Sequence, residues 1–222
     1  ELSSGVRSLA ALSNAPTLVS GTTYEIAFNG VDASGNAATE VSVTGIFFDT
    51  TVPADFTVGS VITTGGTVTA GKWNSTNTGI NVTVPLPNDA TLVDGTLLIR
   101  ANVASGGYED LGSAQTISDG EQGTSKTVSF NAATFEALSS GISDGESILF
   151  TAILTDKAGN ATTGTQSGTS IAFDQSVPAF SSLSPSSNSS VKVADVGYTL
   201  SEAIASGTVK YTRTGGTADG SS

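Results

Sequence analysis

The 222-residue sequence contains no cysteine and no histidine. The chain therefore has no thiolate or imidazole metal ligand, no disulfide, and neither the Cys–His nor the Ser–His pair that activates a catalytic nucleophile. It also has only eight Lys and Arg residues against twenty Asp and Glu, which gives a formal charge of −12. So few cations argue against binding to nucleic acid or to an anionic membrane, and so many carboxylates suit hard cations such as calcium.

Long hydrophobic runs are lacking as well. The longest, such as residues 97–99 and 46–48, have the length of a strand, so we expect no direct insertion into a membrane. Helix formers are few, and residues 134–140 are the only stretch that reads as one or two helical turns. Elsewhere apolar and polar residues alternate over short stretches, as in residues 80–86, between turns rich in Gly, Asn and Asp. This pattern predicts an all-β fold of the β-sandwich type, and Pro85 predicts a bulge or a sheet edge in its strand.

Two stretches of the chain share one plan. The motif Asp-x-x-Gly-Asn begins at Asp32 and again 124 residues later at Asp156. A Thr-rich strand follows each motif, and then Phe-Asp-x-x-Val-Pro, which ends at Pro53 and, 125 residues later, at Pro178. Landmarks at nearly one offset indicate an internal repeat.

The repeat divides the chain into three predicted parts. Residues 53–177 form a complete domain, with an insertion around residues 105–140. Residues 1–52 echo only the second half of this domain, and residues 178–222 echo only its first half. We therefore expect incomplete half-domains at both chain ends, each with an apolar face that it cannot bury alone. Residues 23–30 and 207–213 are predicted strands that lack partners in these halves.

These motifs are similar to those of bacterial immunoglobulin-like (Big or cadherin-like) repeats, the tandem domains of giant secreted surface proteins and adhesins. The resemblance covers nearly the whole chain and implies tandem immunoglobulin-like β-sandwich domains in an extracellular or cell-surface protein. Within it, Leu18-x-x-Gly21-x-x-Tyr24 has the spacing of a tyrosine corner, in which the Tyr hydroxyl bonds back to the preceding turn. Ile148 occupies the corresponding position of the second copy, so the bond should be missing there.

In such a sandwich the linker from the preceding domain and two of the loops meet at one pole. This places Asp49, Asp89 and Asp156 together, and converging carboxylates would bind calcium with backbone carbonyls and water. A bound ion would stiffen the junction between domains, and the resemblance implies calcium there too. The alternative is that each Asp only caps its own turn, as Asp and Asn commonly do.

The following junction has Asp174 in its linker and Glu202 in the next loop, but the final half-domain has no third loop of its own. The one such loop that belongs to no complete domain carries Asp32, in residues 1–52. We therefore predict that the tail of one copy is completed by residues 1–52 of the next, by strand complementation, with Asp174, Glu202 and Asp32 as its metal cluster. The chain is then either a subunit that assembles head to tail or a window of a continuous repeat protein.

These observations favour a structural protein, a repeat unit of an extracellular filament or cell-surface stalk, with other copies or adjacent repeats as partners and calcium as the possible cofactor. No residues form a catalytic site, so we do not expect an enzyme. The alternative is an adhesin segment that binds a glycan or host surface. Trp73 and Tyr108 could form its sugar-stacking surface, although a lone Trp near a strand is more often part of a core.

Overall fold

The computed structural model describes residues 5–6, 8–11, 14–138 and 141–216. The chain divides into two compact units, residues 1–175 and 176–222. Strands are the main regular structure, and helix is limited in the described residues to η1 (Leu9–Ala11), η2 (Ala90–Leu92) and α1 (Ala132–Glu136). The predicted all-β fold is therefore confirmed. No helix in the described ranges is long and apolar enough to cross a membrane.

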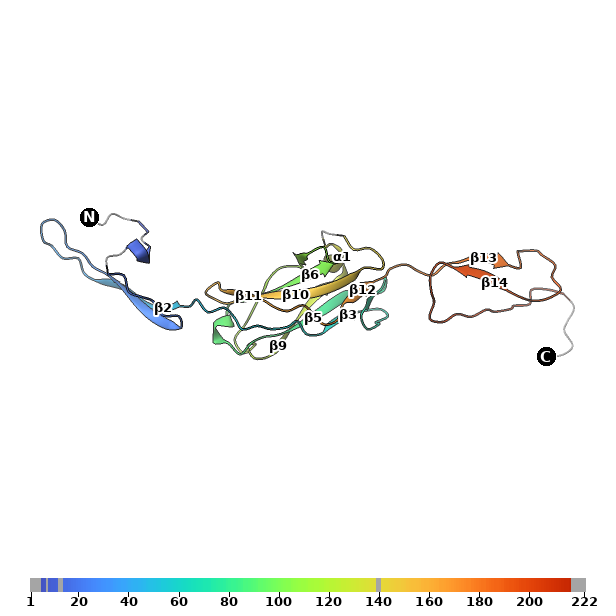
Figure 1. Cartoon of the computed structure of the whole chain (residues 1–222), viewed down its shortest axis with the longest axis horizontal. Coiled ribbons are helices and arrows are strands. Elements are labelled where there is room, and N and C mark those ends of the chain that lie inside the picture. Colours follow the sequence, from blue (N-terminus) through green and yellow to red (C-terminus); the bar gives the residue numbers. More distant parts are fainter. Residues whose placement is uncertain (1–4, 7, 12–13, 139–140, 217–222) are drawn as a thin grey trace. The chain divides into compact units, whose positions relative to one another are not determined.

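Two sheets form the body of the first unit (Figure 1). The larger has the order β4-β12-β10-β6-β7, with β11 also paired to β10 and β8 to β6; the smaller has the order β3-β5-β9. All pairs are antiparallel except β4 with β12. The strands are β3 (Val61–Thr64), β4 (Lys72–Trp73), β5 (Gly79–Pro85), β6 (Thr96–Val103), β7 (Tyr108–Asp110), β8 (Gln115–Thr116), β9 (Ser125–Asn131), β10 (Ser147–Thr155), β11 (Ala161–Thr163) and β12 (Ile171–Phe173).

The two sheets share one core because their strands alternate between buried and less buried residues. In β6 every second residue, from Leu97 to Val103, is buried, and the residues between them are partly exposed. Ile80, Val82 and Val84 of β5 are fully buried from the opposite sheet. Side chains on a strand point alternately to its two faces, so this pattern puts one face of each sheet inside. We call this body, residues 56–173, the central sandwich.

β6 and β10 run side by side in the middle of the larger sheet (Figure 1). Their ladder is continuous from Thr96 opposite Thr155 to Val103 opposite Ile148. Its inward pairs include Leu97 with Leu154, and all inward members are buried.

An aromatic cluster fills one part of this core. Trp73 is fully buried, with its ring centroid 4.6 Å from that of Phe135 and 6.5 Å from that of Phe173. Its indole Nε1 donates a hydrogen bond to Oε1 of Glu136 at 3.0 Å, so the one polar atom of the ring is satisfied. Trp73 is therefore a core residue and offers no surface for stacking a sugar.

A hairpin precedes the central sandwich within the first unit. Its strands are β1 (Thr22–Phe28) and β2 (Val41–Phe48), with a bulge between Tyr24 and Ile26. We call residues 22–48 the head hairpin. The backbone amide of Val19 donates to the hydroxyl of Tyr24 at 2.7 Å, so the tyrosine corner is confirmed. The corresponding Ile148 is a fully buried apolar residue that cannot make this bond.

The second unit contains one antiparallel pair, β13 (Phe180–Ser184) with β14 (Gly197–Leu200). We call its described residues, 176–216, the tail. The sequence predicted a further strand over residues 207–213, and this is wrong for the chain as described: these residues lie in no strand. In the central sandwich the corresponding strand, β6, is held by β10, and the tail sequence has no counterpart of β10.

Two local expectations are corrected in detail. Pro85 lies in the middle strand of the smaller sheet, but it is the last residue of β5, beyond the end of the ladder with β3. There its missing amide costs no ladder bond to β3. The expected helical turn at residues 134–140 exists as α1, which begins two residues earlier and ends at Glu136; residues 139–140 lie outside the described ranges.

Candidate functional site

The turn after β10 is organised by the carboxylate of Asp156. Its Oδ1 accepts the backbone amide of Asn160 at 2.8 Å, and its Oδ2 accepts the Asn160 side-chain amide at 2.9 Å. The backbone amide of Asp156 donates to the carbonyl of Asn160 at 2.9 Å, and Gly159 donates back to the carbonyl of Asp156 at 3.2 Å. Asp156 is buried, so these bonds satisfy a carboxylate that water cannot reach.

The turn of the head hairpin makes the same bonds. Oδ1 of Asp32 accepts the backbone amide of Asn36 at 2.8 Å, and Oδ2 accepts its side-chain amide, also at 2.8 Å. The backbone bonds between Asp32 and Asn36 and from Gly35 are also present. The side-chain amide of Asn36, followed by the backbone amides, lowers the pKa of Asp32 below its ordinary value. Two segments 124 residues apart therefore fold alike at the level of single bonds.

The strands beside these turns also match in register. Tyr24 lies opposite Ile46 in the head hairpin, and Ile148 lies opposite Ile171 in the central sandwich. The amide of Gly21 donates to the carbonyl of Phe48 at 2.8 Å, as Gly145 does to Phe173, also at 2.8 Å. The head hairpin is therefore a structural copy of β10 with its two partner strands.

The tail copies part of the smaller sheet of the central sandwich. Ser184 lies opposite Gly197 as Thr64 lies opposite Gly79. At the other end of each ladder, the amide of Ser201 donates to Ala179 at 3.0 Å, as that of Thr83 donates to Ser60 at 2.9 Å. β13 and β14 thus correspond to β3 and the first half of β5.

Both copies expose residues whose counterparts form the core. Phe150 and Ala152 of β10 are fully buried, whereas Ile26 and Phe28 at the corresponding positions of β1 are 45% and 58% exposed. Among the large hydrophobic residues found exposed in the described ranges, all but Ile62 and Val68 lie before residue 53 or after residue 176. They are Val6, Leu9, Val19, Ile26, Phe28, Val31, Val41, Val43, Phe47 and Val52, and Val177, Phe180, Leu183, Val191, Val193, Val196, Tyr198, Val209 and Tyr211.

The predicted calcium ligands Asp49, Asp89 and Asp156 each have a local role. Asp89 is the N-cap of η2, and its Oδ1 accepts from the amide and the hydroxyl of Thr91 at 2.9 and 2.7 Å. Asp156 holds its own turn. Oδ1 of Asp49 accepts the amide of Thr51 at 2.9 Å and the hydroxyl of Ser20 at 3.1 Å. The alternative reading, in which each Asp caps the local backbone, describes these bonds.

The donor set fits a calcium ion only in part. Across the described residues, no group of three or more acidic side chains could hold a metal ion. One feature favours a cation: Oδ2 of Asp49 is buried and has no hydrogen-bond partner, while the carbonyl of Asp49 accepts the side chain of Asn160 at 3.2 Å. The calcium site stays a prediction, and Asp49 is its best-supported ligand.

The second predicted cluster takes its residues from two parts of the chain and from two copies. Asp174 belongs to the first compact unit and Glu202 to the second, and the prediction takes Asp32 from another copy. The carboxylate of Asp32 already accepts bonds on both oxygens from its own turn. This cluster also stays a prediction.

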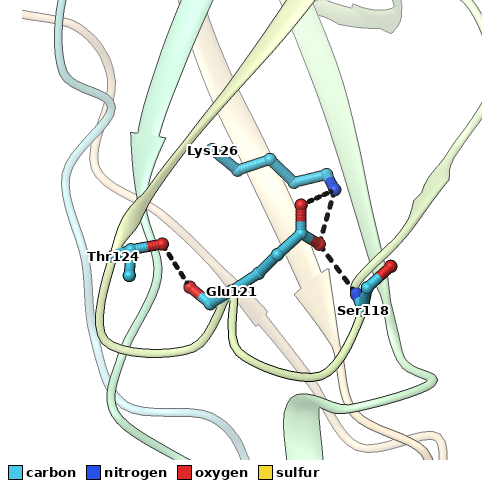
Figure 2. A network of polar contacts seen from close by, with 4 residues as sticks. All are labelled: Ser118, Glu121, Thr124 and Lys126. Atoms are coloured by element: carbon cyan, nitrogen blue, oxygen red, sulfur yellow. Dashed lines mark hydrogen bonds and ion pairs between the residues drawn. The ribbon is translucent and has the colours of Figure 1, made fainter.

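Glu121, an acidic residue that the sequence analysis missed, stabilises a loop that lies next to the loop of Asp89. Figure 2 shows Glu121 between Lys126, whose Nζ lies 2.6 Å from both carboxylate oxygens, and the backbone amide of Ser118 at 2.7 Å. The hydrogen bond from Lys126 is the main reason that the pKa of Glu121 lies below its ordinary value. Gly123 then donates to the carbonyl of Leu86 at 3.1 Å, which ties the two loops together.

Surface features give little support to the adhesin alternative. Trp73 is buried, and Tyr108 donates its hydroxyl to Gln166 at 2.6 Å. A hollow of about 530 Å³ is lined partly by Phe47, Asp49 and Lys157, and it holds no stacked aromatic pair. Binding of a glycan or host surface stays a prediction without a candidate residue.

Neither the models of known protein families nor the curated proteins contain a match to this chain. Its function is therefore inferred from its own repeat and geometry.

The two Asn residues of the repeated turns provide a matched test. Asn160→Ala removes a partner of a buried carboxylate, so we expect a loss of about 1–3 kcal/mol in the unfolding free energy of the central sandwich. Asn36→Ala removes the same bond from an exposed turn outside that core, and we expect a change below about 0.5 kcal/mol. Urea unfolding followed by fluorescence of Trp73, the single tryptophan, measures both. Equal effects of the two substitutions would contradict the assigned roles.

The calcium prediction is tested by thermal and urea unfolding with and without the ion. For an extracellular-type dissociation constant of roughly 0.1–1 mM, about 10 mM calcium should stabilise the sandwich by about 1.4–2.7 kcal/mol. Asp49→Asn should abolish this gain, while Asp110→Asn, at a carboxylate on β7 that pairs with Arg100, should retain it. Unfolding that is unchanged by calcium and by a chelator would eliminate the site.

The lowered pKa of Glu121 predicts a pH-dependent contribution to stability. A carboxylate with a lowered folded-state pKa stabilises fully above its ordinary pKa, and the contribution is lost as the pH falls through the folded-state value. Glu121→Gln should therefore cost about 1 kcal/mol near pH 7, and the gap should close below the ordinary Glu pKa of about 4.3. Asp94→Asn, which breaks the exposed pair with Lys157, serves as the control with a smaller cost at every pH. A gap independent of pH would refute the assignment.

Proposed function

We propose that this chain is a structural protein, a repeat unit of an extracellular filament or cell-surface stalk built from immunoglobulin-like β-sandwiches. The observation that carries the proposal is the head hairpin, which reproduces the bonds and register of β10 and its partners while lacking the strands that face them. The tail carries the complementary side, with copies of β3 and β5. Head and tail therefore correspond to the two halves of one sandwich.

The uncovered apolar faces support this assignment. Residues such as Phe28 and Tyr211, with 58% and 66% exposure, occupy positions whose counterparts Ala152 and Ile99 are buried. Burying such surface contributes about 25 cal/mol for each Å², and long exposed strands invite aggregation. A neighbouring half-domain that covers these faces would bury the exposed apolar surface and would remove the tendency to aggregate.

Two arrangements give the same series of sandwiches. In the first, separate copies join head to tail; in the second, adjacent repeats of a longer chain supply the missing halves. The acidic composition suits the solubility of a stalk in salt water. A row of sandwiches would hold its ends apart, which supports a function as a spacer.

A circular permutant tests the proposal. The chain begins at Pro53, runs to Ser222 and continues from Glu1 to Val52, so that tail and head become neighbours within one polypeptide. We expect a second sandwich to form, with slow amide hydrogen exchange in residues 22–48 and 207–213 and a larger urea m-value than in the parent chain. Trp73 reports separately that the central sandwich is intact.

Two substitutions in the permutant serve as a matched pair. Phe28→Asp places a charge on the face of β1 that should become buried and should abolish the new protection. Glu25→Lys on the opposite face, where the counterpart Leu149 is partly exposed, should preserve it. If exchange in residues 22–48 of the permutant is as fast as in the parent chain, head and tail are not halves of one sandwich and the proposal fails.

A further inference from the structure

We infer that residues 27–31 of one copy, the end of β1 and the three residues after it, pair with residues 208–212 of a second copy, antiparallel and with Phe28 opposite Tyr211. This inference rests on the proposed function and names the partner, a second molecule of the same chain. Its starting point is the β6–β10 ladder of the central sandwich. Residues 207–213 are the tail counterpart of residues 95–101, which include most of β6, and β1 is the head counterpart of β10.

The register follows from these correspondences. Ile99 lies opposite Ala152 in the central sandwich. Tyr211 stands 112 residues after Ile99, and Phe28 stands 124 residues before Ala152. Transfer of the ladder therefore puts Phe28 opposite Tyr211, with Ala27 opposite Thr212 and Asn29 opposite Lys210.

Both prospective edges are available for this pairing. In the part of the chain that the structure describes, β1 is paired only with β2, and the residues after it bond to residues 37 and 38 on the same side, so the other edge carries no ladder. Residues 207–213 are extended in sequence pattern, with Val209 and Tyr211 exposed on alternate positions, and lie in no strand. Each side thus has backbone groups that a partner strand would satisfy.

The side chains at the inward positions are complementary in size. The central pair Ile99 and Ala152 is replaced by two large rings, Tyr211 and Phe28, which are a favourable cross-strand combination. The adjacent inward pair changes in the opposite direction: two leucines become Val209 and Gly30. The side-chain volume added at the first pair is therefore offset by the volume removed at the second. The match ends at Arg213, which replaces the buried Ala101, and the ladder is accordingly limited to residues 208–212.

Charge favours joining head to tail over joining two heads. Residues 1–52 contain five acidic residues and one basic residue, whereas residues 176–222 contain three of each. On the outward face Lys210 would lie opposite Asn29, whose side chain donates to Oε2 of Glu40 at 3.1 Å. The ammonium of Lys210 thus meets a carboxylate, while two heads would bring their acidic residues together.

The absence of cysteine allows a direct test in the full chain. Copies with Ala27→Cys are mixed with copies with Thr212→Cys in denaturant, refolded together and oxidised mildly. We expect the mixed disulfide between residues 27 and 212 to exceed either symmetrical disulfide by at least about tenfold, because pairing raises the local thiol concentration. Mass spectrometry of the linked peptides identifies each product.

Thr208→Cys in place of Thr212→Cys is the matched control. It lies on the same face but is displaced by four residues, or about 13 Å along a strand, so its yield with Ala27→Cys should stay at the level of the symmetrical products. Equal linkage to residues 208 and 212, or a dominance of symmetrical products, would overturn the inference.

A second measurement does not depend on cysteine. Light scattering of the unsubstituted chain should show a mass that rises with concentration. Phe28→Asp should remove the rise, and Glu25→Lys, outside the proposed ladder, should retain it. A chain that stays monomeric throughout, while the circular permutant still forms its second sandwich, would refute pairing between separate copies and leave the proposed function standing. Failure of the permutant as well would remove both.

Discussion

The ladder between β6 and β10 is the interaction on which the central sandwich depends. The two strands lie in the middle of the larger sheet, and their inward residues are buried against the smaller one. A strand whose two faces differ in this way is stable only when a neighbour completes its backbone bonds and an opposing sheet covers its apolar face. The head hairpin has the counterpart of β10 without that of β6, and the tail has the reverse. Among the residues that the structure describes, most of the large exposed hydrophobic side chains lie in these two parts of the chain.

The Asp-x-x-Gly-Asn turn orders the head hairpin without a surrounding core. The turn at Asp32 is exposed and the one at Asp156 is buried, yet both form the same set of bonds. The conformation is therefore local and does not depend on the core. A hairpin that is already in register loses less conformational entropy when it docks, because its backbone is ordered beforehand. In the proposed assembly the same turn would serve folding within a domain and closure between half-domains.

The sequence predicted those features that depend on local spacing. Alternation located β5, the motif offset located the repeat, and the Leu18–Tyr24 spacing located the tyrosine corner. The direction of each carboxylate could not be predicted, because a loop position does not say whether an Asp faces a neighbour or, like Asp89, its own backbone. The role of Asn36 and Asn160 was missed although both recur in the motif, which was the available signal. The strand expected at residues 207–213 failed for a physical reason: periodicity shows that a segment can be a strand, but only a partner makes it one.

The differences between the two copies have a consequence for folding in a crowded array. Phe28 stands where the central sandwich has Ala152, and Tyr24 stands where it has Ile148. A head hairpin that entered the central sandwich in place of β10 would force large rings into a filled core, at a cost of about 1–3 kcal/mol for each misfit. In the proposed assembly this sequence divergence would disfavour domain-swapped misfolding, because each hairpin would dock best on the half that its own side chains fit.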